Sequence, residues 1–159
     1  MSKLATFLWF ENRAGEAANF YVSIFKKSKI TSGGHSGDES TSDIVPAVSI
    51  SFELDGQEFI AFNGGSLFSF SPATSFFVKC ETQEEVDHYW ESLSANGGEK
   101  QRCAWLKDKY GVTWQIVPNI LVELLSDEDP IKAKRVLDAM LQMEKIEIAE
   151  LMMAYNAGI

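Results

Sequence analysis

One predicted strand in the last third of the chain carries a polar side chain among apolar ones, and this side chain could bind a ligand. The stretch DKYGVTWQIVPN, residues 108–119, is typical of a turn followed by a strand, and Gln115 stands there between Trp114 and Ile116. An amide can donate and accept hydrogen bonds but has no charge with which to hold a metal ion. Two interpretations are open: Gln115 contacts a small polar ligand, or it satisfies a buried neighbouring group.

The two cysteines are the next residues that could do chemistry. A strand is predicted over 102–108, and Cys103 and Trp105 would share one face of it. A thiol on a cavity face could act as a nucleophile if a neighbouring base or positive charge lowered its pKa. An inert buried thiol is the simpler interpretation of Cys103, and more so of Cys80. Without a C-x-x-C spacing, neither a disulfide framework nor a zinc site is indicated.

Charge and hydropathy exclude several classes of partner. The chain has 14 Lys and Arg against 23 Asp and Glu, a net charge of −9. Such a surface disfavours nucleic acid and anionic membranes. No apolar run approaches the ~18 residues that a membrane span needs. The N-terminus has no signal-peptide core, so a cytoplasmic protein is expected.

The remaining pattern predicts a strand, a helix and three strands, twice over. The helix over 82–98 has the clearest signals, because Thr82 and Glu85 form a capping box and Asn96-Gly97-Gly98 ends it. The first copy comprises a strand at 4–10, a helix at 14–25, a strand from 28, and a hairpin of 47–54 and 57–63 turned by Asp55-Gly56. The second comprises strands at 74–81, near 98–101, at 102–108 and at 112–118, besides its helix.

Two further segments complete the chain. A Gly- and Ser-rich stretch, SGGHSGDES, lacks the spacing of a nucleotide-binding loop and is interpreted as a mobile loop; the alternative is a lid with His35 at its tip. At the other end, Asp129 and Pro130 begin a helix, and a last short helix follows. Its wide apolar surface predicts a homodimer; the residues are Ile146, Ile148, Leu151, Met152 and Met153.

Three stretches resemble one family. FLWFENRAGEAANFYVSIF, FNGG and CAWLKDKYGVTWQIVP are similar to the PhnB-like, 3-demethylubiquinone-9 3-methyltransferase-like branch of the vicinal oxygen chelate superfamily, which includes glyoxalase I and bleomycin-resistance proteins. The resemblance implies an α+β fold of two βαβββ modules that form a curved mixed sheet around a cavity. A single domain is expected, with modules at about 3–65 and 73–118 and a helical extension at 119–159. The resemblance also implies a homodimer.

In metal-using relatives, four side chains on the sheets bind a divalent cation. By motif spacing, the resemblance places three of these positions at Thr6, Ser75 and Gln115, and the fourth among Phe59, Ala61 and Asn63. Neutral hydroxyl and amide groups are poor ligands for such an ion, so neither a metal nor another cofactor is expected. Thr6, Asn63, Ser75, Trp105 and Gln115 are therefore predicted to bind a ligand, with Cys103 as a weak catalytic candidate.

Two functions remain open. The first is a metal-independent module that binds a small organic, partly aromatic molecule. The second is an enzyme acting on a small quinone-like or aromatic substrate, as the methyltransferase name suggests. S-adenosylmethionine enzymes of the common type use a doubly wound parallel sheet with a glycine-rich first turn. Neither feature is predicted here.

Overall fold

A computed structural model describes residues 2–33 and 49–158 of the chain. The chain divides into two compact units, Met1–Phe70 and Ser71–Ile159. The predicted loop with His35 lies outside the described residues. In the described part, no helix is both long enough and apolar enough to cross a membrane.

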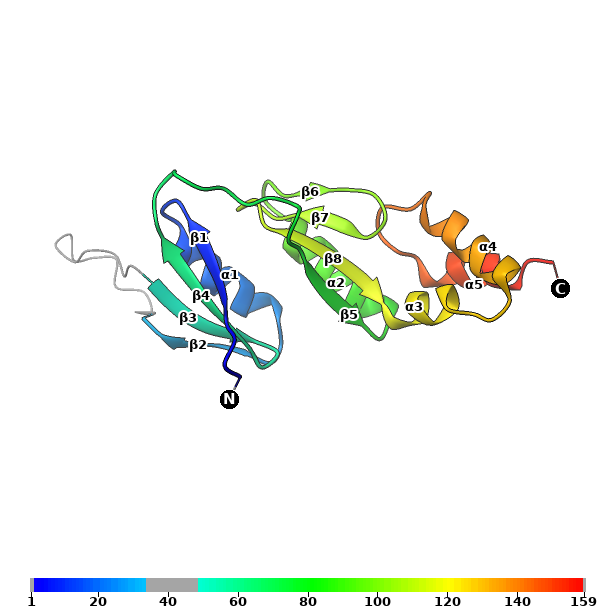
Figure 1. The fold of residues 1–159 in the computed structure, drawn as a ribbon, viewed down its shortest axis with the longest axis horizontal. Coiled ribbons are helices and arrows are strands. Elements are labelled where there is room, and N and C mark those ends of the chain that lie inside the picture. Colours follow the sequence, from blue (N-terminus) through cyan, green and yellow to red (C-terminus); the bar gives the residue numbers. More distant parts are fainter. Residues whose placement is uncertain (1, 34–48, 159) are drawn as a thin grey trace. The chain divides into compact units, whose positions relative to one another are not determined.

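The first unit is one four-stranded mixed sheet with one helix (Figure 1). Its elements are β1 (Thr6–Phe10), α1 (Ala14–Ile24), β2 (Ser28–Ser32), β3 (Ser49–Leu54) and β4 (Gln57–Asn63). The strands lie in the order β1-β4-β3-β2, and only the β1–β4 pair is parallel. Asp55 and Gly56 turn the β3–β4 hairpin with φ of 51° and 83°, as the Asp-Gly signal predicts.

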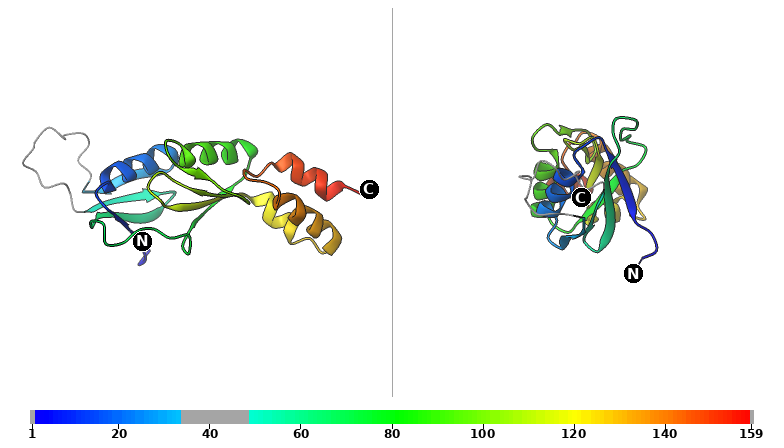
Figure 2. Two further views of the ribbon diagram at one scale, coloured as in Figure 1. Left: turned by 90° about the horizontal axis from the view of Figure 1, so that it is seen from above. Right: turned by 90° about the vertical axis from the view of Figure 1, so that its left-hand side faces the viewer.

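Helix α1 covers one face of this sheet (Figure 2). Its fully buried Tyr21 stacks on Phe52, with ring centroids 6.2 Å apart, and Phe52 stacks on Phe59 at 5.3 Å. These residues come from the helix, β3 and β4, and they form the core of the unit. The helical spacing of apolar residues therefore predicts both the helix and the face that it buries.

The second unit repeats the same element order. Its elements are β5 (Phe76–Cys80), α2 (Gln83–Ser94), β6 (Glu99–Lys100), β7 (Trp105–Lys107) and β8 (Thr113–Pro118). The strand order β5-β8-β7-β6 repeats that of the first sheet, and β5 and β8 are the parallel pair. Thr82 Oγ1 accepts the Glu85 N–H at 3.2 Å, so the predicted N-cap of α2 is confirmed. The helix ends at Ser94, four residues earlier than predicted.

Three more helices pack beyond the end of β8 in the second unit (Figure 1). They are α3 (Asn119–Leu125), α4 (Pro130–Met140) and α5 (Ile148–Asn156). Asp129 caps α4 by accepting the Ile131 N–H at 2.9 Å, as predicted. Ile146 and Leu151 are fully buried in the cluster that these helices form, whereas Met153 is 73% exposed. Part of the apolar surface that predicts a dimer is thus used inside the chain.

The strand predicted over 102–108 is wrong in its first half. Strand β7 begins at Trp105, and residues 102–104 form a turn. Cys103 and Ala104 have positive φ, 58° and 75°, which an extended strand does not allow. Cys103 and Trp105 therefore do not alternate along one strand face.

Candidate functional site

Three predicted ligand-binding residues come together on the open face of the second sheet, by which we mean the face directed away from α2. Trp105 lies directly opposite Gln115 in the β7–β8 register, and Phe77 lies opposite Gln115 in the β5–β8 register. Gln115 Nε2 donates to Ser75 Oγ at 3.0 Å, just before β5 begins. Residues paired in this way share a face. The open face thus carries an amide and a hydroxyl between two aromatic side chains.

The opposite face of the same strands explains why Gln115 can point outward. Trp114 and Ile116 alternate with it and are 2% and 0% exposed, among the core residues of this unit. Gln115 itself is half-buried. The packing of β8 is therefore supplied by its neighbours, and the amide is free of that role.

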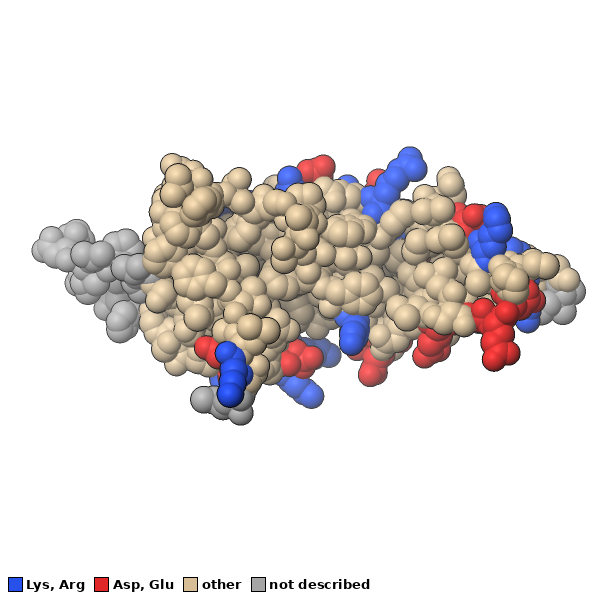
Figure 3. Space-filling view, in the orientation of Figure 1, with Lys and Arg blue, Asp and Glu red and all other residues tan. Residues whose placement is uncertain are grey.

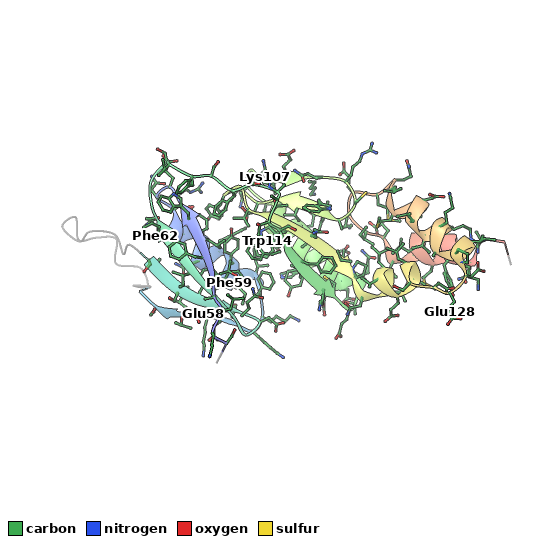
Figure 4. All side chains as sticks on the ribbon, viewed as in Figure 1. Glu58, Phe59, Phe62, Lys107, Trp114 and Glu128 are labelled. Carbon is green, nitrogen blue, oxygen red and sulfur yellow. The ribbon has the colours of Figure 1, made fainter. Side chains whose placement is uncertain are left out.

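Positive charge borders the open face. Lys79 lies two residues after Phe77 on β5, and Lys107 two residues after Trp105 on β7, so both belong to this face by alternation. Figure 4 shows Lys107 on β7, next to the strand that carries Trp114. A planar molecule with a hydroxyl, carbonyl or anionic group matches this combination of aromatic, amide and ammonium groups.

A buried carboxylate holds the turn between β7 and β8. Asp108, 2% exposed, accepts the backbone N–H of Tyr110 at 2.9 Å and of Val112 at 3.0 Å through Oδ1. Its Oδ2 accepts the Trp114 indole N–H at 2.9 Å. This residue was not among the sequence candidates. The available signal was an aspartate three residues before the turn glycine, Gly111, between two predicted strands.

The other two predicted ligand residues lie in the first unit, on the side of α1. Thr6 is paired with the core residue Phe59 and shares its face. Asn63 Oδ1 accepts the backbone N–H of Ala14 at 2.8 Å, at the first residue of α1. Asn63 therefore fixes the start of the helix, which has no side-chain cap of its own at Arg13. Ligand contacts by Thr6 and Asn63 stay a prediction.

The face of the first sheet that is directed away from α1 is aromatic, which the sequence reasoning did not predict. Phe62 contacts Phe7 and Trp9, with ring centroids 5.3 and 5.1 Å apart, and Trp9 contacts Phe68 at 4.9 Å. Phe7 and Phe68 are 55% and 60% exposed. Over β1 and β4 the view of this face shows few charged side chains (Figure 3). The alternation of Phe7 and Trp9 with buried Leu8 and Phe10 was the available signal.

The FNGG motif positions this aromatic face. Gly64 has no Cβ, and a Cβ built there would lie 2.3 Å from Trp9 Cε2. Gly65 adopts φ of 88°, and its carbonyl accepts the Trp9 indole N–H at 2.9 Å. Together with the Asn63 cap, the motif ties β4 to both α1 and Trp9.

Neither cysteine thiol forms a hydrogen bond with Gln115 or Ser75. Cys103 Sγ donates to the Met140 carbonyl at 3.7 Å, toward the C-terminal helices. Burial raises the pKa of the Cys80 thiol to about 12, with a smaller contribution from the Glu85 carboxylate. Cys80 is thus an inert core residue, as predicted.

The donor set does not fit a divalent cation. Ser75 and Gln115 offer a neutral hydroxyl and a neutral amide, which cannot offset the desolvation of such an ion. Among residues 2–33 and 49–158, no three His, Cys, Asp or Glu side chains gather in a way that could hold one.

Comparison with known proteins agrees with this architecture. A family model described as 3-demethylubiquinone-9 3-methyltransferase matches residues 2–117. A PhnB protein of Bacillus cereus, named as a candidate 3-demethylubiquinone-9 3-methyltransferase, is 37% identical over 74% of this chain and 99% of its own, with a TM-score of 0.63.

More distant structures show the fold alone. Protein PA1353 of Pseudomonas aeruginosa is 14% identical, with a TM-score of 0.59 over 74% of this chain and 98% of its own. A glyoxalase/bleomycin resistance protein of Albidiferax ferrireducens is 12% identical, with a TM-score of 0.50 over 74% of this chain and 99% of its own. No curated protein matches. The chain belongs to the 3-demethylubiquinone-9 3-methyltransferase-like (PhnB) family and has the α+β fold of the glyoxalase/bleomycin resistance proteins, that of the vicinal oxygen chelate superfamily.

Proposed function

We propose that the protein binds a small, partly aromatic organic molecule on the open face of its second sheet, without a metal. The observation that carries the proposal is the Gln115–Ser75 hydrogen bond of 3.0 Å between Trp105 and Phe77. Phe77 is 47% exposed, although a large apolar side chain of a strand usually packs inward. A flat ring lying on these aromatic side chains would bury apolar surface, while the amide and hydroxyl would fix its polar substituent.

A second candidate is an enzyme acting on a small quinone-like or aromatic substrate. The family description favours it, because a demethylubiquinone is such a molecule. The two candidates share the same binding face and differ in outcome: a binding module returns its ligand unchanged. The sheets here are mixed and mostly antiparallel, unlike the doubly wound parallel sheet of common S-adenosylmethionine enzymes.

Replacing Gln115 by leucine is expected to weaken the binding of 2-naphthol about tenfold, equivalent to about 1.4 kcal/mol. The reason is that leucine keeps the volume but removes the hydrogen-bonding group. The free energy of unfolding is expected to fall by only about 0.5 kcal/mol, since the half-exposed Ser75 hydroxyl can turn to water. Titrations followed by the indole N–H signal of Trp105 in NMR spectra measure affinity, and urea unfolding measures stability.

Two controls sharpen this test. Binding of 2-methylnaphthalene, which has the same shape without the hydroxyl, is expected to be equal in both proteins. Gln57→Leu, an exposed strand glutamine of the first unit, is expected to change nothing. EDTA should leave all affinities unaltered. A stability loss well above 1 kcal/mol with unaltered affinity would instead make Gln115 a scaffold residue.

We also propose a cytoplasmic homodimer. The two free thiols suit a reducing compartment. Large apolar side chains remain exposed at Phe7 in the first unit and at Ile131 and Met153 among the C-terminal helices. Surfaces of this kind are typical of association.

Sedimentation velocity at micromolar concentration is expected to show a species of twice the mass of the chain. Phe7→Glu and Met153→Glu place a charge on the two candidate interfaces, and the variant that dissociates identifies the one used. A monomer at all concentrations, with both variants behaving like the parent, would contradict the dimer.

A further inference from the structure

A turn with strained backbone stands directly before the candidate site. Cys103 and Ala104 have φ of 58° and 75°, in the left-handed region that non-glycine residues avoid. Two such residues in a row persist only where the surroundings impose the conformation. Trp105, the next residue, begins β7 and lies opposite Gln115. The conformation of the turn therefore sets where Trp105 enters the sheet.

Backbone hydrogen bonds hold the turn at Cys103 and Ala104 from two sides. The N–H groups of Cys103 and Ala104 donate to the carbonyls of Met143 and Glu144 at 2.8 and 2.9 Å. The carbonyl of Ala104 accepts the Ile116 N–H of β8 at 2.9 Å. The turn is thus held between the sheet and the segment 143–148, which is called the strap below; it lies between α4 and α5 and includes the first residue of α5.

Hydrogen bonds and an ion pair also join the strap to α2. The Gln83 side chain donates from Nε2 to the Ile146 carbonyl at 3.0 Å and accepts the Ile148 N–H at Oε1, at 2.8 Å. Lys145 Nζ lies 2.9 Å from Asp87 Oδ1. This pair raises the pKa of Lys145, mainly through its hydrogen bond to Asp87, and hydrogen bonds from Gln83 and then Lys145 lower the pKa of Asp87. Ile146 is fully buried beneath.

We propose that the strap is a positioning element: by holding Cys103 and Ala104 in their strained conformation, it places Trp105 opposite Gln115 and thereby controls ligand binding at the open face. The part of this proposal that concerns the ligand rests on the proposed function, whereas the effect on the turn does not. The strap lies outside residues 2–117, which the family model matches. Residues of the matched part bind it from two sides: Gln83 and Asp87 of α2, and the turn at Cys103 and Ala104.

Releasing the strap is expected to make the half-buried Cys103 thiol more accessible. Gln83→Leu removes three side-chain hydrogen bonds with little change of volume: the two to the strap and one to Asp87 Oδ1 at 2.9 Å. Lys145→Gln weakens the contact with Asp87 as a second, milder route. The rate at which Cys103 reacts with 5,5′-dithiobis(2-nitrobenzoate) should rise about tenfold in Gln83→Leu, because opening of the turn becomes more frequent. Cys80 is fully buried and its pKa is about 12, so the signal reports on Cys103. Cys103→Ser confirms the assignment.

A matched control and a rescue complete the design. Gln142→Leu changes an exposed glutamine beside the strap and should leave the rate within about twofold of the parent. Ala104→Gly, combined with Gln83→Leu, should return the rate toward that of the parent, since glycine adopts positive φ without strain. The Trp105 indole signal should shift in Gln83→Leu and recover in the double variant.

The possible outcomes distinguish a failure of the strap proposal from a failure of the proposed function. An unchanged thiol rate and an unchanged Trp105 signal in both Gln83→Leu and Lys145→Gln would overturn the proposal. A faster thiol reaction with unaltered 2-naphthol affinity would overturn the control of binding by the strap. If the parent protein does not bind 2-naphthol, the proposed function fails, while the thiol rate and the indole signal still decide whether the strap holds the turn.

Discussion

Replacing Asp108 by alanine is expected to lower the free energy of unfolding by about 3–4 kcal/mol, the largest effect of any single side chain considered. The carboxylate, 2% exposed, accepts three hydrogen bonds, and its loss leaves the N–H of Val112 and the indole N–H of Trp114 buried without it. Because Trp114 packs in the core beneath Gln115, the candidate site should be perturbed as well. Urea unfolding followed by tryptophan fluorescence measures the change.

A partner variant and a control at an exposed carboxylate accompany Asp108→Ala. Trp114→Phe removes one donor and keeps most of the ring, so it should cost less than Asp108→Ala. Asp138→Ala removes an exposed carboxylate paired with Lys134 at 2.7 Å and should cost less than about 0.5 kcal/mol. A loss below about 1 kcal/mol for Asp108→Ala would show that the turn does not depend on its carboxylate.

Gly64→Ala is expected to lower the free energy of unfolding by about 2–3 kcal/mol through overpacking. The added Cβ would stand 2.3 to 2.6 Å from three ring atoms of Trp9. The indole cannot simply move aside, because its N–H donates to Gly65 O at 2.9 Å and its ring contacts Phe62 and Phe68. Thermal or urea unfolding checks the loss.

A rescue tests the cause of that loss. In a Trp9→Leu background the ring atoms that meet the new Cβ are absent, so Gly64→Ala should then cost less than about 0.5 kcal/mol. Equal costs in the two backgrounds would mean that the glycine is required for its backbone conformation and not for its closeness to Trp9.

The sequence by itself determined the order of the elements and many of their bounds, except that it did not predict helix α3. Local signals sufficed because they act within a few residues: Thr82 and Asp129 cap α2 and α4, and Asp55-Gly56 turns the β3–β4 hairpin. Alternation also identified Trp114 and Ile116 as the packed side of β8, and hence Gln115 as the residue on the other side. Such patterns depend on which side chains prefer burial, and the alternation of apolar and polar residues along each strand shows that preference directly.

Only the tertiary structure decided which candidates meet. Ser75 and Gln115 lie forty residues apart and form a hydrogen bond because β5 and β8 are neighbours in one sheet, whereas the Asn63 amide is used to fix the start of α1. The turn at Cys103 and Ala104 escaped prediction since its positive φ is unfavourable locally and is imposed by the strap, whose bonding partners come from about forty residues further along the chain. Backbone hydrogen bonds between distant residues do not depend on side-chain type, so they produce no periodic pattern in the sequence. The cause of this turn can therefore be identified only in the folded chain.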